Sequence, residues 1–278
     1  MIDLEFDHFC RLVHERSGLV LGPEKAYLVR GRLDSIARTE GLADVAALLA
    51  LIRKVAPDRL IQRCVDALAT HESSFFRDGA PFEALKTQVL PQLLAGRNPP
   101  RPLRIWCAAC SSGQEPYSLA IALNELANPQ VLRGIEIIAT DFSEPILAKA
   151  RAGVFSDFEV RRGLTPERLQ RWFRDEGGAW KITESIARMV TFRPHNLLKG
   201  TTGMGVFDII FCRNVLIYFD PERKRRVLES LAAALADDGS LFLGSAETIL
   251  GLTDKLETTP GARGIYRKAP IISAQRAG

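Results

Sequence analysis

The feature that most constrains the fold is the stretch from residue 103 to residue 119, which reads LRIWCAACSSGQEPYSL. It begins as a short apolar run, passes into small residues, and opens a helical pattern behind Pro116. A strand, a small-residue turn and a helix N-terminus in this order are typical of the first crossover of a doubly wound sheet, where ligands bind beyond the carboxyl end of the strand. Small side chains let a ligand approach the backbone closely. The acidic Glu115 favours a ligand with hydroxyls or a cation over a pyrophosphate.

The rest of the C-terminal part alternates between strand and helix patterns. Candidate strands are 103–107, 135–140, 189–193, 207–212, 240–244 and 263–268, with helical patterns at 116–127, 144–151 and 221–236. This alternation predicts an α/β fold with a Rossmann-like, mostly parallel doubly wound sheet. The segment 154–188 does not fit a single crossover, because it holds a short helix (166–173), a Gly-Gly turn and a strand around Trp180. We expect a small inserted β-subdomain there, at about 154–192.

Residues 1 to about 90 have helical spacing throughout, as in Phe6, Phe9 and Val13. The stretch AGRNPPRP (95–102) is the clearest linker, since adjacent prolines prevent a helix from continuing. We therefore predict an all-helical N-terminal domain over 1–90, followed by the α/β domain over 91–278.

Composition limits the class of protein. The chain has 278 residues, of which 46% are hydrophobic, so it can bury a full core. No apolar stretch is long enough to span a bilayer, and the N-terminus lacks the order of a secretory signal, so we expect a cytoplasmic protein without membrane insertion. The net charge of +4 is too small to indicate nucleic-acid binding.

The pair Cys107 and Cys110 has the CxxC spacing of a redox pair. The alternative is that both are small buried residues in a tight turn, and we favour this interpretation. The five cysteines are scattered and form no second pair for zinc, so no disulfide framework and no metal is expected.

The glycine-rich fingerprint of dinucleotide-binding proteins is missing, since residues 108–111 are Ala-Ala-Cys-Ser. Their side chains would crowd a pyrophosphate, whereas S-adenosylmethionine (SAM) has no phosphate. Asp141 ends the second strand and can bind both ribose hydroxyls, although it could also cap the next helix. Arg213 and Asn214 end the fourth strand, where they could bind a ligand or satisfy backbone groups. The Asn/Asp-Pro-Pro-aromatic box of amino-methylating DNA enzymes is absent there, which disfavours base methylation.

Six segments in order resemble the CheR family of chemotaxis receptor glutamate methyltransferases. They are HESSFFR (71–77), RIWCAACSSGQEPYSLA (104–120), ATDFSEPILAKARAGVF (139–155), HNLL (195–198), FDIIFCRNVLIYFD (207–220) and SLFLGSAE (240–247). The resemblance implies an all-helical N-terminal domain, a SAM-dependent domain with an inserted β-subdomain, and methyl transfer from SAM to receptor glutamates. It also implies S-adenosylhomocysteine (SAH) as product, the cytoplasmic helical domain of methyl-accepting chemotaxis receptors as partner, and a monomer.

The resemblance also implies a role for each matching residue. Arg77 and Tyr218 would lie nearest the reactive methyl group. The residues expected to bind the cofactor are His71, Ser73, Arg77, Glu115, Asp141, Asn196, Leu197, Arg213 and Asn214. Arg32 and Arg38 would grip an acidic receptor helix. The chain departs from the family pattern at His71 and Ser73, where Asn and Thr are usual, and at Gln114, where the family has Glu.

The expected chemistry needs no general base, because a glutamate with a pKa of about 4.3 is already ionised at neutral pH. The four histidines form no convincing Ser-His-Asp set. Two other classes stay open from the sequence: a SAM enzyme with a different acceptor, and a SAM-sensing module without transferase activity.

Overall fold

The computed structural model describes residues 4–95, 102–126 and 134–270. It divides into two compact units. Unit 1 comprises Met1–His71 and Tyr218–Arg223, and unit 2 comprises Glu72–Ile217 and Lys224–Gly278. Residues 96–101 of the expected linker lie outside the described residues.

Unit 1 is helical, as predicted. Its elements before residue 72 are α1 (Leu4–Ser17), η1 (Pro23–Lys25), α2 (Ala26–Thr39), α3 (Val45–Val55) and α4 (Asp58–Leu68). Phe9, Val13, Val29, Leu33 and Leu48 are fully buried, which gives this unit a core of its own.

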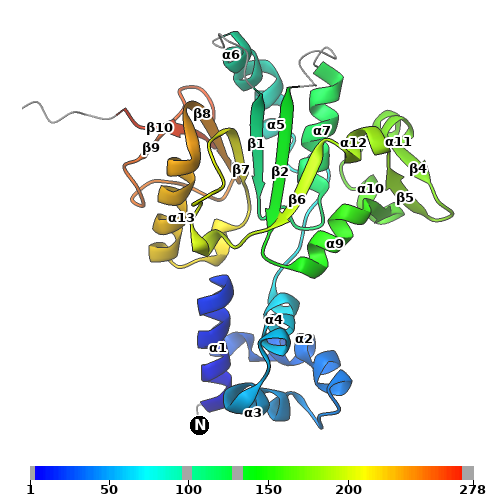
Figure 1. The fold of residues 1–278 in the computed structure, drawn as a ribbon, viewed down its shortest axis with the longest axis vertical. Coiled ribbons are helices and arrows are strands. Elements are labelled where there is room, and N and C mark those ends of the chain that lie inside the picture. Colours follow the sequence, from blue (N-terminus) through cyan, green and yellow to red (C-terminus); the bar gives the residue numbers. More distant parts are fainter. Residues whose placement is uncertain (1–3, 96–101, 127–133, 271–278) are drawn as a thin grey trace, which may run out of the picture. The chain divides into compact units, whose positions relative to one another are not determined.

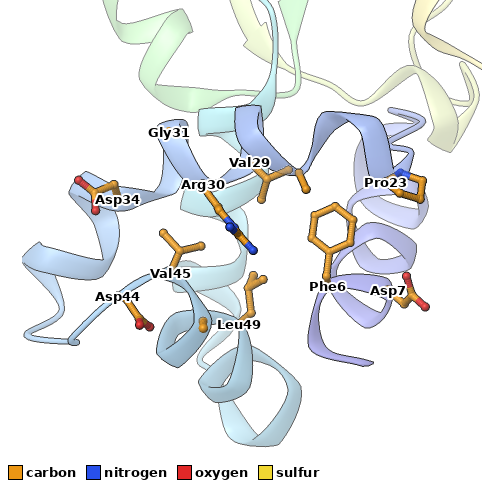
Figure 2. A pocket seen from close by; sticks show the side chains of 12 residues that line it. Phe6, Asp7, Pro23, Val29, Arg30, Gly31, Asp34, Asp44, Val45 and Leu49 are labelled. Carbon is orange, nitrogen blue, oxygen red and sulfur yellow. The ribbon is translucent and has the colours of Figure 1, made fainter. Parts of the chain in front are cut away.

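A pocket opens among α1, η1, α2 and α3 of this unit (Figure 2). Phe6, Val29, Val45 and Leu49 give it apolar walls, and the side chain of Arg30 extends into it.

The segment Tyr218–Arg223 belongs to unit 1 although it is remote in sequence. Asp220 Oδ1 accepts a hydrogen bond from the backbone N–H of Arg223 at 2.9 Å. Its Oδ2 lies 2.8 Å from both Arg223 Nη1 and His14 Nε2. The Arg223 amide, followed by the side chains of Arg223 and His14, lowers the pKa of Asp220 well below its ordinary value. The carboxylate therefore ties this segment to α1 in its ionised form.

We expect Asp220→Asn to destabilise the protein by about 1 kcal/mol at pH 7, because the amide keeps the cap to Arg223 but loses the charge. A carboxyl group whose pKa is lowered by folding stabilises the native state above its unfolded pKa, and this contribution is lost as pH falls below about 4. The gap between variant and wild type should therefore be complete above about pH 5 and shrink as the pH falls from about 4 towards about 2, in thermal unfolding followed by circular dichroism. A gap that stays constant with pH would contradict the ionic role.

Unit 2 is built on a seven-stranded sheet in the order β6-β2-β1-β7-β8-β10-β9 (Figure 1). The strands are β1 (Leu103–Ala108), β2 (Ile135–Asp141), β6 (Val190–Pro194), β7 (Phe207–Cys212), β8 (Leu235–Leu243), β9 (Leu256–Thr258) and β10 (Ile265–Lys268). The first five strands of this order are parallel, and β10 runs antiparallel to both β8 and β9. The chain moves outward from β1 to β2 and β6, then returns to β7 on the other side of β1. The carboxyl ends of β1 and β7 therefore form the switch point where such sheets bind ligands.

The connecting helices are α7 (Gln114–Leu126), α9 (Glu144–Ala152), η3 (Leu197–Lys199), η4 (Leu216–Tyr218) and α13 (Pro221–Ala234). Helices α7 and α9 pack against β2 and β6. The core of the sheet contains a stacked aromatic pair, in which the ring centroids of Phe211 on β7 and Phe242 on β8 are 4.3 Å apart.

The division between the units differs from the expected boundary at residue 90. Residues 80–95 form α5 (Ala80–Ala84), a π-helical turn η2 (Leu85–Val89) and α6 (Leu90–Ala95). They are helical, but Phe82, Leu85 and Leu93 are buried in the same core cluster as the strands of unit 2. Helical periodicity predicts a helix and does not indicate which core the helix covers.

The inserted subdomain is a three-stranded antiparallel sheet in the order β3-β5-β4. Its elements are β3 (Val154–Ser156), α10 (Asp157–Arg161), α11 (Pro166–Trp172), β4 (Phe173–Asp175), β5 (Ala179–Ile182) and α12 (Glu184–Ala187). Residues 190–192, which we placed in the subdomain, belong to β6 of the large sheet. The sequence pattern missed β3, β4 and β9, which have three residues each.

Strand β8 begins five residues before the expected start at 240, because Leu235 already pairs with Phe207 ahead of an irregularity in the ladder. Across the described ranges of the chain, no helix has the length and hydropathy needed to traverse a bilayer.

Candidate functional site

Backbone strain is concentrated in three loops of unit 2. Among the described residues, those other than glycine with positive φ are Phe76, Asp78, Ala109, Ser111 and Asn214. Such conformations cost on the order of 1 kcal/mol or more each and persist where surrounding contacts impose them, often at functional sites. Two of the loops follow β1 and β7 at the switch point, and the third carries Arg77.

The loop after β1 is held by the end of β2. The Cys110 N–H donates to the carbonyl of Thr140 at 2.8 Å. Asp141 is almost fully buried, and its Oδ2 accepts from the Ser111 N–H at 2.9 Å while its Oδ1 accepts from the Ser143 N–H at 3.1 Å. The carboxylate thus joins the loop after β1 to the start of α9.

The start of α7 is closely packed. Gln114 is buried, and its Oε1 accepts from the Ser112 hydroxyl at 2.8 Å, so this departure from the family pattern forms part of the turn. Gly113 has φ +94°, and a Cβ there would lie 3.1 Å from Ala150 Cβ. A side chain at this position would therefore push the loop away from α9.

The guanidinium of Arg213, which is 1% exposed, lies at the centre of the site. Its Nη1 donates to Glu115 Oε2 at 2.8 Å. Its Nη2 donates to Asp78 Oδ2 at 2.6 Å and to the carbonyl of Arg77 at 3.1 Å. Arg213 Nε is buried with no hydrogen-bond partner in the described structure. The side chain thus connects the loop after β7 with α7 and with the loop of Arg77, and its terminal nitrogens are committed to protein groups.

Burial raises the pKa of Glu115, and the charge and hydrogen bond of Arg213 oppose this rise. Glu115 Oε2 takes the bond from Arg213, while Oε1 has no hydrogen bond within the described ranges. A cationic ligand group near Oε1 would favour the ionised form.

Arg77 lies between two of the strained residues, Phe76 (φ 47°) and Asp78 (φ 67°). The Phe76 N–H donates to the hydroxyl of Ser118 on α7 at 2.9 Å. The Arg77 carbonyl is held by Arg213, and its side-chain Nη1 donates to the carbonyl of Glu72 at 3.0 Å. The loop is thus fixed through its backbone, while the Arg77 side chain is only half-buried.

The loop after β7 is fixed by Glu247, a residue to which the sequence analysis assigned no role. Its carboxylate accepts from the N–H groups of Asn214, Val215, Leu216 and Gly244, at distances between 2.7 and 2.9 Å. The motif SLFLGSAE contains it, but nothing in the spacing shows that a side chain after β8 would hold the loop after β7.

Asn196 and Leu197 lie just after β6. Asn196 caps η3, where its Oδ1 accepts from the Leu198 N–H at 3.0 Å, and Leu197 is buried. The preceding His195 donates its backbone N–H to the carbonyl of Asp141 at 2.9 Å. Asn196 and Leu197 thus follow directly on a residue that is tied to the end of β2.

Of the other predicted residues, all but Ser73 are assigned to unit 1, and some of their side chains bind other protein groups. Ser73 is half-buried in unit 2, whereas His71 and Tyr218 are assigned to unit 1. Arg32 Nη1 donates to the carbonyls of Leu68 and Ala69 at 2.8 and 3.0 Å, so it closes the C-terminus of α4. Arg38 is largely exposed and pairs with Asp34 one turn earlier on α2.

Cys107 and Cys110 are buried free thiols, and burial raises the pKa of both well above the ordinary value. A reactive cysteine needs the opposite shift. The geometry therefore favours the interpretation of both as small packing residues.

The hydrogen-bond acceptors near the switch point suit SAM. Two carboxylates, Glu115 in the first turn of α7 and Asp141 at the end of β2, are of the kind that can accept hydrogen bonds from an ammonium group and from ribose hydroxyls. The small residues of the loop after β1 are compatible with close approach of a nucleoside to the backbone.

Comparison with known families identifies both parts of the chain. The CheR methyltransferase SAM-binding domain matches residues 71–265, and the CheR methyltransferase all-alpha domain matches residues 4–69. The chain belongs to the CheR methyltransferase family. Its resemblance to this family and its Rossmann-like fold with a helical N-terminal part, as predicted from the sequence, are confirmed.

Curated relatives in the CheR family match nearly the whole chain. "Chemotaxis protein methyltransferase 1" of Vibrio cholerae serotype O1 is 43% identical over 272 residues, which cover 96% of this chain and 97% of the relative. "Chemotaxis protein methyltransferase 1" of Pseudomonas aeruginosa is 41% identical over 271 residues, covering 95% and 97%. A solved structure described as a DhpI–SAH complex aligns at 17% identity with a TM-score of 0.35 over 70% of this chain and 69% of its own, which is too weak a likeness to extend this result.

As a CheR-family protein, the chain is a chemotaxis protein methyltransferase with a SAM-binding domain.

Proposed function

We propose that this protein transfers the methyl group of SAM to glutamate side chains in the helical cytoplasmic domain of methyl-accepting chemotaxis receptors. The products are glutamate 5-methyl esters and SAH, and the reaction serves sensory adaptation. The observation that most supports this proposal is the network of Glu115, Arg213 and Asp78, centred on the buried Arg213 side chain, in a CheR-family SAM-binding domain.

SAM supplies an electrophilic methyl group on a sulfonium. The bond from sulfur to the methyl carbon breaks as the bond from a glutamate oxygen forms, and the sulfur keeps the electron pair. Because the acceptor is already an anion at neutral pH, the protein has no proton to remove. Its tasks are to align the two groups and to exclude water, which can lower the barrier by several kcal/mol.

The residues of the site divide these tasks. Asp141 would accept from the ribose hydroxyls, and Glu115 would accept from the methionyl ammonium. Asn196 and Leu197 would flank the adenine, with His71 and Ser73 as further cofactor contacts. Arg77 would hold a carboxylate with its planar guanidinium, and Tyr218 would donate a hydrogen bond near the acceptor oxygen.

Arg213 would lie beside the cofactor, but its guanidinium would not bind the cofactor directly. Its Nη atoms are bonded to Glu115, Asp78 and the Arg77 carbonyl, so they orient the residues that face the ligand. Asn214, in the left-handed conformation, would present its amide to the methionyl part.

The receptor-binding role of Arg32 and Arg38 stays a prediction. Arg32 already binds carbonyls at the end of α4, and Arg38 is paired with Asp34. The side chain of Arg30, on the same helix, makes no hydrogen bond or ion pair with any other described residue and extends into the pocket of Figure 2. We therefore expect Arg30 to contribute at least as much as Arg32 to binding an acidic helix.

The proposal is tested by incubating the protein with a purified receptor cytoplasmic fragment and methyl-tritiated SAM. We expect label on the fragment that mild alkali releases as volatile methanol, as methyl esters require. A fragment whose acceptor glutamates are changed to alanine should take up no label. Alkali-stable label would indicate N-methylation and contradict the proposal. Binding of SAM without label on any receptor fragment would favour another acceptor or a SAM-sensing role.

A further inference from the structure

Glu247 occupies an unusual position for a carboxylate, since it is buried and surrounded by backbone amides of two loops. Oε2 accepts from the Asn214 N–H at 2.8 Å and from the Gly244 N–H at 2.7 Å. Oε1 accepts from the Val215 N–H at 2.9 Å and from the Leu216 N–H at 2.7 Å. Three consecutive amides after β7 thus converge on one side chain, which lies 31 to 33 residues away in the sequence.

These amides have no regular partner of their own. Strand β7 ends at Cys212, and the short helix η4 begins only at Leu216. A buried N–H without an acceptor destabilises the fold, and the Glu247 carboxylate supplies the acceptors that a neighbouring strand would otherwise provide. Asn214 has φ 59°, in the left-handed region that Asn enters more readily than most residues, and its N–H points to Glu247 in that conformation.

Gly244 makes the contact possible. A Cβ at this position would lie 2.8 Å from both Glu247 Oε2 and Asn214 Nδ2, and 2.9 Å from Asn214 N. The absence of a side chain at 244 therefore lets the loop after β8 approach the loop after β7. Glu247 also raises the pKa of Glu115 by charge repulsion, so its charge is felt at the cofactor side of the site.

We propose that Glu247 is a positioning residue for methyl transfer. It sets the conformation of Asn214, and with it the adjacent Arg213, and acts on the cofactor only through them. This inference rests on the SAM-binding role of the site, but it does not depend on which acceptor is methylated.

The test is Glu247→Gln, which keeps the volume of the side chain and replaces one oxygen by an NH₂ group that faces two N–H donors. We expect Kd for SAH, measured by calorimetry without acceptor, to rise at least about tenfold. We also expect faster hydrogen exchange at the amides of residues 214–216 in the ligand-free protein. The control is Ser245→Ala, an exposed position in the same loop, which should bind SAH like the wild type.

A double-mutant cycle separates positioning from general stability. Asn214→Gly removes the side chain and accepts positive φ without strain. If Glu247 acts through Asn214, Glu247→Gln should cost much less SAH affinity in the Asn214→Gly background than in the wild type. Equal costs in both backgrounds would overturn the proposal, as would a Glu247→Gln variant that loses thermal stability but binds SAH normally. Because none of these measurements uses a methyl acceptor, failure of the glutamate acceptor assay would leave this result interpretable.

Discussion

Asp141→Ala should abolish measurable binding of SAM at micromolar concentration. Two hydrogen bonds from ribose hydroxyls to a buried carboxylate contribute about 1.5 kcal/mol or more each, so we expect Kd to rise roughly 100-fold or more. Isothermal titration calorimetry of the ligand-free protein with SAM and with SAH measures this change directly.

The carboxylate also braces the protein, because it accepts from the Ser111 and Ser143 amides. Asp141→Asn therefore accompanies the alanine variant, since it keeps one oxygen for an amide and loses the charge. The matched control is Asp208→Asn, a buried carboxylate at the start of β7 that accepts from the Arg104 N–H. If Asp141 were only a brace, its variants would lower the melting temperature as Asp208→Asn does and leave Kd for SAM within about threefold.

Arg77→Ala should lower kcat for methyl transfer by about 10²–10³-fold, which is typical when a preorganised polar contact to the reacting groups is removed. We expect this substitution to disturb the loop little. The Arg77 carbonyl, not its side chain, holds Arg213, and the neighbouring Phe76 amide is held by Ser118. Truncation should therefore leave the loop in place.

The measurement is single-turnover transfer of tritiated methyl groups to a receptor fragment, alongside calorimetry with SAH. We expect SAH affinity to change by less than about tenfold, while transfer is nearly lost. Arg77→Lys keeps the charge without the planar fork and should recover only part of the rate. Arg188→Ala, which removes an exposed arginine paired with Glu184 on the surface, serves as the control. Transfer by Arg77→Ala at the rate of this control would remove Arg77 from the mechanism.

The strands of the large sheet and the residues at their ends could be predicted from the sequence, because parallel buried strands are continuous apolar runs and their carboxyl ends meet at one edge. Asp141 and Arg213 stand at the ends of such runs, and the structure places Asp141 at the carboxyl end of β2 and Arg213 directly after β7. The strands β3, β4 and β9 were not predicted, because three residues are too few to show the alternation of a strand.

The role of Glu247 could not be predicted from the spacing of residues, since its partners are backbone amides. Every residue except proline has such an amide, so the sequence does not mark which of them bind Glu247. The same holds for Asp78, which is an exposed loop residue by its sequence context and yet binds the guanidinium of Arg213. Which side chain binds the N–H and C=O groups of a strained loop depends on the folded conformation of the backbone. Only the structure could show that Arg32 serves the end of α4.

Because Tyr218–Arg223 belongs to unit 1, the helical unit is not a continuous segment of the chain, which affects the choice of fragments for expression. Phe219 is buried in unit 1, and a Cβ on Gly18 would lie 2.7 Å from its ring. A fragment ending at residue 71 would lack this ring and the carboxylate that binds His14. Truncation at a single site therefore does not yield the complete helical unit. An expressed version of this unit needs residues 218–223 added to it.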